Sequence, residues 1–269
     1  MLLSSLALSA FALATLAAPQ AIAPPPARYA FELIDPAEAV MACHLELDGL
    51  DGPVVLNLPE RMAYAVLAEP RLDGEVELLS PGELTRDGPY TWTLEPAGST
   101  AELTWRVPLD HRSLPELERS TYEYPYVDED HGLLATGALA LAPRDLEAVD
   151  LQVRITVPDG WPVLAPWPEA SPGVFAPRDV SALQRDLIAI GHWDVVRPQI
   201  DGVVAAVAFA PGQDELAASV GPALTRVSEH EIGLFGRVPN AHYLFAFGKP
   251  DPGSYGGSVK ANSMTLFVS

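Results

Sequence analysis

The stretch VDLQVRITV, residues 149 to 157, decides how the fold of this chain is interpreted. Every second residue is apolar, and polar or charged side chains stand between them. The apolar positions are Val149, Leu151, Val153, Ile155 and Val157. A period of two is typical of a β-strand that has one face on a core and the other in water. The stretch therefore predicts a strand and not a helix.

Similar runs recur from Arg28 to about Ala210, separated by Pro, Gly and Asp about every 8 to 15 residues. Most of them have no helical pattern between them, which argues against a parallel α/β sheet. We expect a mainly β protein, with a β-sandwich or saddle-like antiparallel sheets over residues 24–210. The expected strands are 29–34, 40–47, 53–58, 63–68, 75–79, 90–95, 101–107, 133–141, 149–157, 187–195 and 202–210.

The pattern changes after residue 210. A helix is predicted from Asp214, with an apolar stripe at Leu216, Val220, Leu224 and Val227. Gly221-Pro222 interrupts it, and proline predicts a kink or a break into two helices there. Strands at 241–247 and 264–268 follow. These elements are too few for an independent core, so residues 211–269 are expected to be the truncated start of a larger α+β domain.

Composition limits the possible partners and compartments. The 269 residues are 48% hydrophobic, as in a globular protein, and the formal charge of -20 makes this an acidic protein that would repel nucleic acids and anionic membranes. Cys43 is the only cysteine and lies in an expected strand, so it is predicted to be a small buried hydrophobe without a disulfide.

The first 23 residues resemble a secretory signal peptide. They carry no charged side chain, their apolar run is too short to span a bilayer comfortably, and they end in small residues. Cleavage after Ala23 competes with cleavage after Ala17 or Ala18. We expect a secreted or periplasmic protein whose mature chain is not inserted in a membrane; the alternative is an uncleaved anchor.

Motif searches give few candidates for catalysis. The phosphate-binding, dinucleotide-binding, nucleophile-elbow and C-x-x-C patterns are absent from the sequence. His230-Glu231 begins like the zinc motif H-E-x-x-H, but Leu234 occupies the position of the second histidine. We therefore interpret His230 and Glu231 as solvated helix residues and Leu234 as a core contact. The acidic run 122–132 contains DEDH, and its consecutive carboxylates favour a solvated loop over a calcium site.

Several stretches resemble one peptidase family. They are RYAFELIDPAEAVMACHLEL (28–47), VPDGWPVLAP (157–166), GVFAPRDVSALQRDLIAIGHWDV (173–195), and FGRVPNAHYLFAF (235–247) followed by YGGSVKANSMTL (255–266). Their order resembles the N-terminal domain and the start of the catalytic domain of the glycyl aminopeptidase family of zinc metallopeptidases (metallopeptidase family sixty-one). The resemblance implies an incomplete thermolysin-like domain after the β domain. It also implies that zinc is bound in intact relatives, and that the β domain supports the catalytic domain and shapes access to its cleft.

The family-matched positions lack the chemistry that the resemblance implies. The family has Gly-Gly-Leu-Glu-His-x-x-Ser where this chain has Gly256, Gly257, Val259, Lys260 and Ser263. The family's glutamate is expected to hold the substrate's terminal ammonium, whereas Val259 has no charge and Lys260 would repel it. Losing such a charge-assisted contact costs on the order of 2 to 5 kcal/mol. We therefore expect no catalytic, cofactor-binding or metal-binding residue here. The plain alternative for YGGSVK is a flexible Gly-rich turn.

The preferred hypothesis is a secreted non-catalytic glycyl-aminopeptidase-like protein, a truncated product or pseudoenzyme remnant, whose partners are peptides or a separately encoded catalytic domain. One alternative is a stand-alone peptide- or glycan-binding β-sandwich module of the cell envelope. Another is a hydrolase with an unrecognised active site. Exposure of the tryptophans separates the first two, because a binding module needs an exposed aromatic groove. The tryptophans are Trp92, Trp105, Trp161, Trp167 and Trp193.

Overall fold

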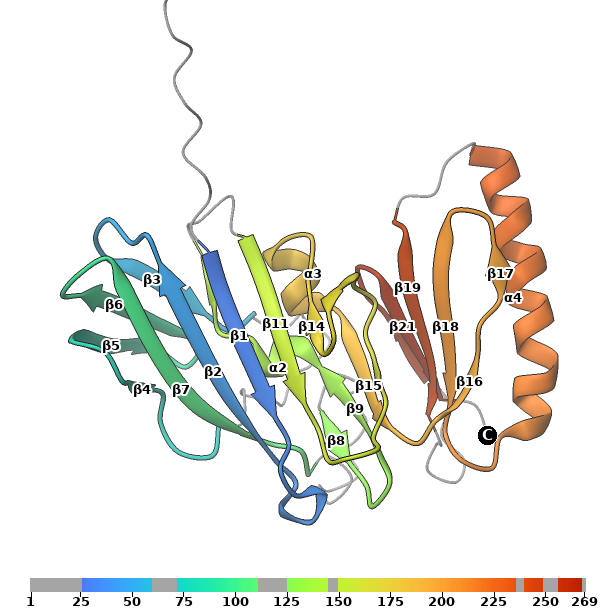
Figure 1. The fold of residues 1–269 in the computed structure, drawn as a ribbon, viewed down its shortest axis with the longest axis horizontal. Helices are drawn as coiled ribbons and strands as arrows, with labels where there is room; N and C mark the ends of the chain where they lie inside the picture. The colour runs from blue at the N-terminus through green and yellow to red at the C-terminus, as the bar shows by residue number, and fades with distance from the viewer. Residues whose placement is uncertain are drawn as a thin grey trace, which may run out of the picture.

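The computed structural model describes residues 26–59, 72–110, 125–144, 150–235, 240–248 and 256–267. The described part is mainly β, as predicted, with four sheets and one long helix near the C-terminus (Figure 1). The signal peptide predicted at 1–23, the strand predicted at 63–68 and Val149 lie outside the described residues.

Sheet A is the large sheet in the middle of Figure 1. Its strand order is β13 (Glu169–Ser171), β14 (Val174–Phe175), β11 (Asp150–Thr156), β1 (Pro26–Glu32), β2 (Val40–Asp48), β7 (Thr100–Pro108) and β4 (Glu77–Leu78). β1 is parallel to β11, and β2 is antiparallel to both β1 and β7. The alternation predicted for β11 is confirmed: Leu151, Val153 and Ile155 are buried, while Gln152 and Arg154 are exposed.

Sheet B packs against sheet A and closes the main core. Its order is β10 (Ala142–Pro143), β3 (Val54–Asn57), β6 (Thr91–Pro96) and β5 (Gly82–Gly88). Alternate residues of β2, among them Cys43, join the same apolar cluster as Leu56 of β3 and Trp92 of β6. The predicted burial of Cys43 is confirmed, because the residue is fully buried.

Polar atoms of buried aromatic residues connect sheet A to the segment before β10. The Tyr29 hydroxyl donates to the Leu141 carbonyl at 3.0 Å, and Trp105 Nε1 donates to the Leu139 carbonyl at 3.0 Å. Burial raises the pKa of Tyr29, so its hydroxyl stays protonated and remains a donor. These bonds satisfy buried groups that would otherwise destabilise the core.

Sheet C lies between this core and the C-terminal part of the chain. Its order is β12 (Val163–Leu164), β15 (Leu187–Gly191), β9 (His131–Ala135) and β8 (Tyr126–Val127). β9 and β15 are buried on both faces. Leu134 and Ile188 pack toward sheets A and B, whereas Leu133 and Leu187 pack toward sheet D. Continuous apolar runs are typical of strands covered on both sides.

Short helices flank sheet C and correct one predicted strand. They are the 3-10 helix η1 (Pro36–Glu38), α2 (Thr136–Leu139) and α3 (Val180–Arg185). The strand predicted at 133–141 was too long, because the chain turns into α2 after Ala135. A Cβ atom on Gly137 would lie 2.5 Å from the Gln184 carbonyl oxygen, so the α2 backbone packs directly against α3.

Sheet D and the long helix form the right-hand end of the molecule in Figure 1. The order is β16 (Asp194–Val196), β18 (Val203–Phe209), β19 (His242–Gly248), β21 (Ser263–Phe267) and β20 (Gly256–Val259), with β17 (Gln199–Ile200) also paired to β18. β18, β19 and β21 are parallel, and β20 is antiparallel to β21. The predicted boundary after residue 210 falls between β18 and α4, so sheet D takes strands from both sides of it.

The helix α4 (Asp214–Phe235) is continuous, so of the two predicted outcomes at Gly221-Pro222, a kink or a break, the break into two helices is wrong. The first three residues of the predicted apolar stripe pack on sheet D, as expected. They are Leu216, Val220 and Leu224. Pro222 lies on the exposed side of the helix, where water can replace the hydrogen bond that its missing N–H cannot form.

The apolar stripe of α4 does not extend to the end of the helix. Val227 is 58% exposed and Leu234 is 64% exposed, which corrects the expectation that both belong to the core. His230 and Glu231 are exposed, as predicted. Among the described helices, none is long and apolar enough to cross a membrane.

Candidate functional site

The family-matched positions lie on the edge of sheet D. β20 pairs with β21 from Gly256 opposite Phe267 to Val259 opposite Met264. The Lys260 amide donates to the Ser263 carbonyl at 2.8 Å, which closes the turn between the two strands. The structure therefore places YGGSVK largely in an ordered edge strand, and the alternative of a flexible turn is wrong for Gly256 to Val259.

Glycine is required at the centre of this strand. A Cβ atom on Gly257 would lie 2.5 Å from the Thr265 carbonyl oxygen and 2.9 Å from a Leu266 methyl group. Both are closer than real Cβ contacts, so any larger residue would push β20 away from β21. The Gly-Gly pair thus has a packing role that is independent of catalysis.

Val259 carries an exposed apolar side chain at the position where the resemblance implies a carboxylate. It is 76% exposed, the highest value among the large hydrophobic residues of the described chain. Its neighbour along the chain is Lys260, which also has no acidic group. The strand geometry is present, but a group that binds an ammonium is not supplied at either position.

Ser263 belongs to a buried polar network centred on Asp186, the residue between α3 and β15. Asp186 is only 1% exposed. Its Oδ1 accepts from the Asn262 amide at 2.6 Å and from the Ser263 hydroxyl at 2.9 Å. Its Oδ2 accepts from Asn262 Nδ2 at 2.8 Å and from Trp167 Nε1 at 2.9 Å. Hydrogen bonds from several donors stabilise a carboxylate that is out of contact with water.

The network fixes the β20–β21 turn to sheet C. The Ser263 hydroxyl also accepts from the Leu187 amide at 2.9 Å, so one side chain connects β21 to both Asp186 and β15. The Thr136 hydroxyl donates to the Asp186 carbonyl at 2.8 Å and adds the start of α2 to the same cluster. Asp186 thus joins the end of α3, sheet C and the edge hairpin of sheet D.

No sequence motif identifies Asp186 or Trp167 as members of this site. A signal was present, because Asp186 directly precedes the apolar run LIAIG, where an unpaired charge would be costly. Ser263 was predicted only as a family-matched position, and the structure assigns it a hydrogen-bonding role.

Two other sequence predictions concern metals and aromatic residues. Within the described ranges, no group of three or more His, Cys, Asp and Glu side chains could hold a metal ion. Trp92, Trp105, Trp167 and Trp193 are buried. Trp161 is half-buried, with its ring 6.3 Å from that of His192. The described tryptophans therefore form core contacts and do not line an exposed aromatic groove.

A comparison with known families bears on these strands directly. Residues 79–185 match the Peptidase M61 N-terminal domain. The match begins directly after β4, includes β5 and β6 of sheet B, and ends at the last residue of α3, next to Asp186. The resemblance to this peptidase family predicted from the sequence is thereby confirmed for residues 79–185, whereas β1, β2 and β3, which also contribute to the main core, precede the match.

Solved structures extend the similarity of fold beyond the M61 match. An aminopeptidase N family protein from Idiomarina loihiensis is 17% identical with a TM-score of 0.71, and the alignment covers 90% of this chain and 42% of that one. An M1 zinc metallopeptidase from Deinococcus radiodurans is 14% identical with a TM-score of 0.56, covering 91% of this chain and 59% of that one. The chain thus spans about half the length of these structures. No curated protein matches it.

Proposed function

We propose that the protein is a secreted, non-catalytic relative of the aminopeptidase-type metallopeptidases, in which sheets A, B and C support the edge strand of sheet D. The observation that carries the proposal is the combination at β20 and β21. The scaffold side chains Ser263 and Asp186 are hydrogen-bonded, whereas position 259 carries valine. An aminopeptidase of the type implied by the resemblance needs an acidic group to hold the substrate's ammonium.

The exposure of aromatic and apolar side chains favours this proposal over a glycan-binding module. Four of the five tryptophans are buried, while Val227, Leu234 and Val259 are exposed on α4 and sheet D. Val204 of β18 is exposed as well, so four of the six exposed large hydrophobic residues of the described chain lie on sheet D and α4, the end of the molecule that a further polypeptide would cover. We propose that the partner is a separately encoded peptidase-type domain or a peptide, and that the mature chain lies outside the cytoplasm, as residues 1–23 indicate.

The test is an activity and metal assay on the full purified chain. We expect no chelator-sensitive release of amino acids from glycyl or alanyl chromogenic substrates, and less than stoichiometric zinc by elemental analysis. An active metallo-aminopeptidase measured in the same plate controls the assay. One equivalent of bound zinc together with chelator-sensitive turnover would overturn the proposal.

Val259→Glu provides a second measurement on the same position. The side chain is exposed, so the variant should fold with an unchanged melting temperature, and Val227→Glu on α4 is a matched control for the added charge. If position 259 faces a site for ammonium groups, Val259→Glu alone should bind glycinamide detectably by calorimetry. If the two variants bind glycinamide equally, or if neither binds it, position 259 does not face a site for ammonium groups.

A further inference from the structure

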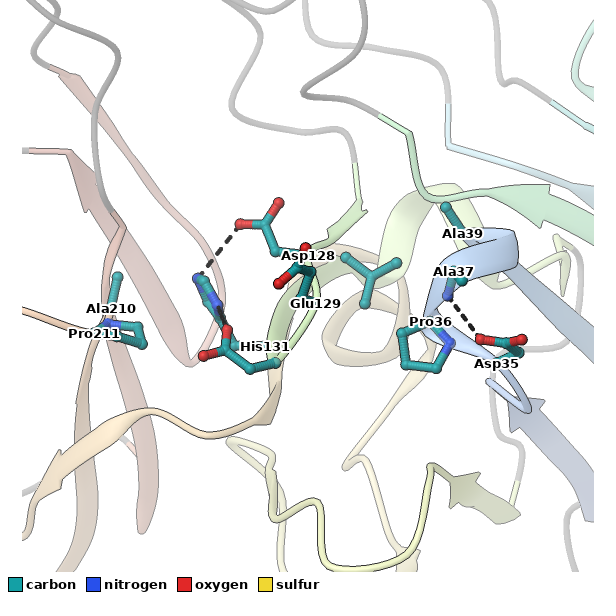
Figure 2. Close-up of a pocket in the computed structure, with 11 residues that line it drawn as sticks. Asp35, Pro36, Ala37, Ala39, Asp128, Glu129, His131, Ala210 and Pro211 are labelled. Atoms are coloured by element: carbon teal, nitrogen blue, oxygen red, sulfur yellow. Dashed lines mark hydrogen bonds and ion pairs between the residues drawn. The ribbon is translucent and has the colours of Figure 1, made fainter.

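A pocket of about 810 Å³ lies between η1, the β8–β9 turn and the segment Ala210-Pro211 (Figure 2). Its buried side chain is His131, whose Nδ1 lies 2.7 Å from Asp130 Oδ1 and whose Nε2 lies 3.7 Å from Asp128 Oδ2. Both ring nitrogens therefore face carboxylates of the pocket itself, and the other two carboxylates of the lining are exposed. The pocket specifies no ligand of its own, and the face of sheet D beside α4 is different.

The helix side of sheet D includes Phe209 and Phe247, which belong to one apolar cluster with the stripe of α4. Because side chains alternate between the two faces of a strand, every second residue of β19 and β21 points to this side as well. Val259 joins them, since it stands opposite Met264 in the antiparallel pair of β20 with β21. We call this set the helix-side face; it consists of Tyr243, Phe245, Met264, Leu266 and Val259.

The helix α4 covers only one end of sheet D, because it packs on β16, β17 and β18 (Figure 1). A helix with its side chains is about 10 Å wide and neighbouring strands lie about 4.8 Å apart, so one helix covers about two strands. On the helix-side face, the residues of β19 and β21 are half-buried and Val259 is 76% exposed. Parallel strands such as β18, β19 and β21 are typically buried on both faces. Among the described residues, the part of the sheet beyond α4 is therefore wide enough for about one more helix.

The flank of α4 that borders the helix-side face is apolar too. A Cβ atom on Gly221 would meet the Val196 side chain, so the Gly221 flank is the one toward β16. At about 100° per residue, Val227 and Leu234 lie about 120–140° around the helix from Gly221, past the stripe, on the flank toward β19. Both are exposed. Two apolar surfaces, one on the sheet and one on α4, thus adjoin each other.

A second copy of this chain fits this surface less well than another polypeptide does. The side of α4 opposite its stripe carries exposed Glu215, Pro222 and Glu229, so a second α4 would bring carboxylates onto apolar side chains. Each chain also has a formal charge of -20, which opposes self-association. The same charge favours a partner that has Lys or Arg beside its apolar stripe.

We propose that the helix-side face docks a basic amphipathic helix of a partner polypeptide, which lies beside α4 with its apolar stripe on β19, β21 and β20. The inference rests on the proposed function in that the partner is a polypeptide, and it adds the structure, position and charge of the docked segment. β19 has 7 residues and is about 23 Å long. A helix of about 18 residues, about 27 Å long, spans it.

The test is calorimetric titration of the full chain with a synthetic peptide of about 18 residues that is patterned as a basic amphipathic helix of Leu, Ala and Lys. One control peptide has the same composition in an order without an apolar stripe, and a second has Glu in place of Lys. We expect the basic amphipathic peptide to bind at least about tenfold more tightly than either control, because it alone combines the stripe with positive charge.

Variants at exposed valines show whether binding occurs on the helix-side face. Val259→Lys and Val227→Lys should each weaken binding at least about tenfold, whereas Val204→Lys should not. Val204 is a matched control, because it is 62% exposed on β18 but alternation places it on the opposite face of sheet D. The ¹³C methyl shift of Met264 should move on saturation, and that of Met41, which is fully buried in the main core, should stay.

Several results would overturn the docking proposal. They are equal binding of the peptide without a stripe, unchanged binding by Val259→Lys, absence of binding by every peptide, and a stable dimer of this chain that Val259→Lys dissociates. The zinc and activity assay separates this proposal from the proposed function. Bound zinc with turnover would overturn the proposed function alone, and failure of the basic peptide to bind would overturn the docking proposal alone.

Discussion

Replacing Asp186 by alanine tests whether the buried carboxylate holds the edge hairpin of sheet D to sheet C. The substitution removes all four hydrogen bonds to the carboxylate. The Ser263 hydroxyl and the Asn262 side-chain amide can reorient toward other partners. The Trp167 indole and the Asn262 backbone amide have fixed N–H directions, so both lose their acceptor.

The expected destabilisation follows from those two donors. A buried donor without a partner costs about 1–3 kcal/mol, so Asp186→Ala should lower the free energy of unfolding by about 2–6 kcal/mol. Asp186→Asn keeps one acceptor oxygen and should lower it by about 1–3 kcal/mol, since one fixed donor then faces the new amide group. Removal of a buried charge offsets part of each loss.

The measurement is urea unfolding followed by circular dichroism and by tryptophan fluorescence. Asp159→Ala is the matched control, because Asp159 is an exposed turn residue and its removal should change the free energy of unfolding by less than about 0.5 kcal/mol. If Asp186→Ala unfolds at the same urea concentration as the control, the network does not stabilise the fold and the reasoning is refuted.

Three further outcomes are expected. Gly191→Ala should lower the free energy of unfolding by about 1–3 kcal/mol more than Gly202→Ala. Both glycines have a positive φ, but only at Gly191 would a Cβ atom meet the Asp130 backbone. An equal drop in melting temperature for the two variants would contradict this. Burial by itself would raise the pKa of Asp179, but hydrogen bonds from the Ala182 amide and from Arg178 outweigh it and hold the pKa below the ordinary value of an aspartate. The stability that its charge contributes is present above that value and lost as pH falls below it; the difference in urea midpoint between wild type and Asp179→Asn should therefore shrink from about pH 5 to about pH 3, and a constant difference would argue against it. Burial raises the pKa of the Cys43 thiol, so an aromatic disulfide reagent should modify it at about pH 8 only after unfolding, and rapid labelling of the native protein would refute this.

Local periodicity predicted most of the long strands. Alternation identified β2, β7 and β11, because each has one face on the core and one in water. It failed where burial is two-sided or a turn is tight. The run 133–141 is apolar except for Thr136, and the chain leaves the strand after Ala135, where Gly137 approaches the α3 backbone closely. Which strands share a sheet depends on long-range pairing and was not encoded in any single window.

The course of α4 and the candidate site also depend on contacts between residues that are far apart in the sequence. The sequence predicted a kink or a break at Pro222, and the helix does not break there, because packing of its apolar side chains on sheet D outweighs the local penalty of proline. Position 259 could be compared with a family pattern along the chain. The role of Asp186 could not be predicted in this way, because its hydrogen-bond partners come close to it only in the folded protein. These partners are Trp167, Asn262 and Ser263.

The parallel pairing of β1 with β11 has a consequence for synthesis. Pro26 lies opposite Asp150, so one edge of β1 stays open until the ribosome has made more than a hundred further residues. At about 5–20 residues per second, this takes on the order of 6–24 seconds. During that time β1 and β2 form a hairpin with an unpaired side. Arg28, which pairs with Glu46 and Asp48 of β2, and Glu32 place exposed charges on β1, and charged side chains on an open strand edge are the kind that discourages pairing with other nascent chains.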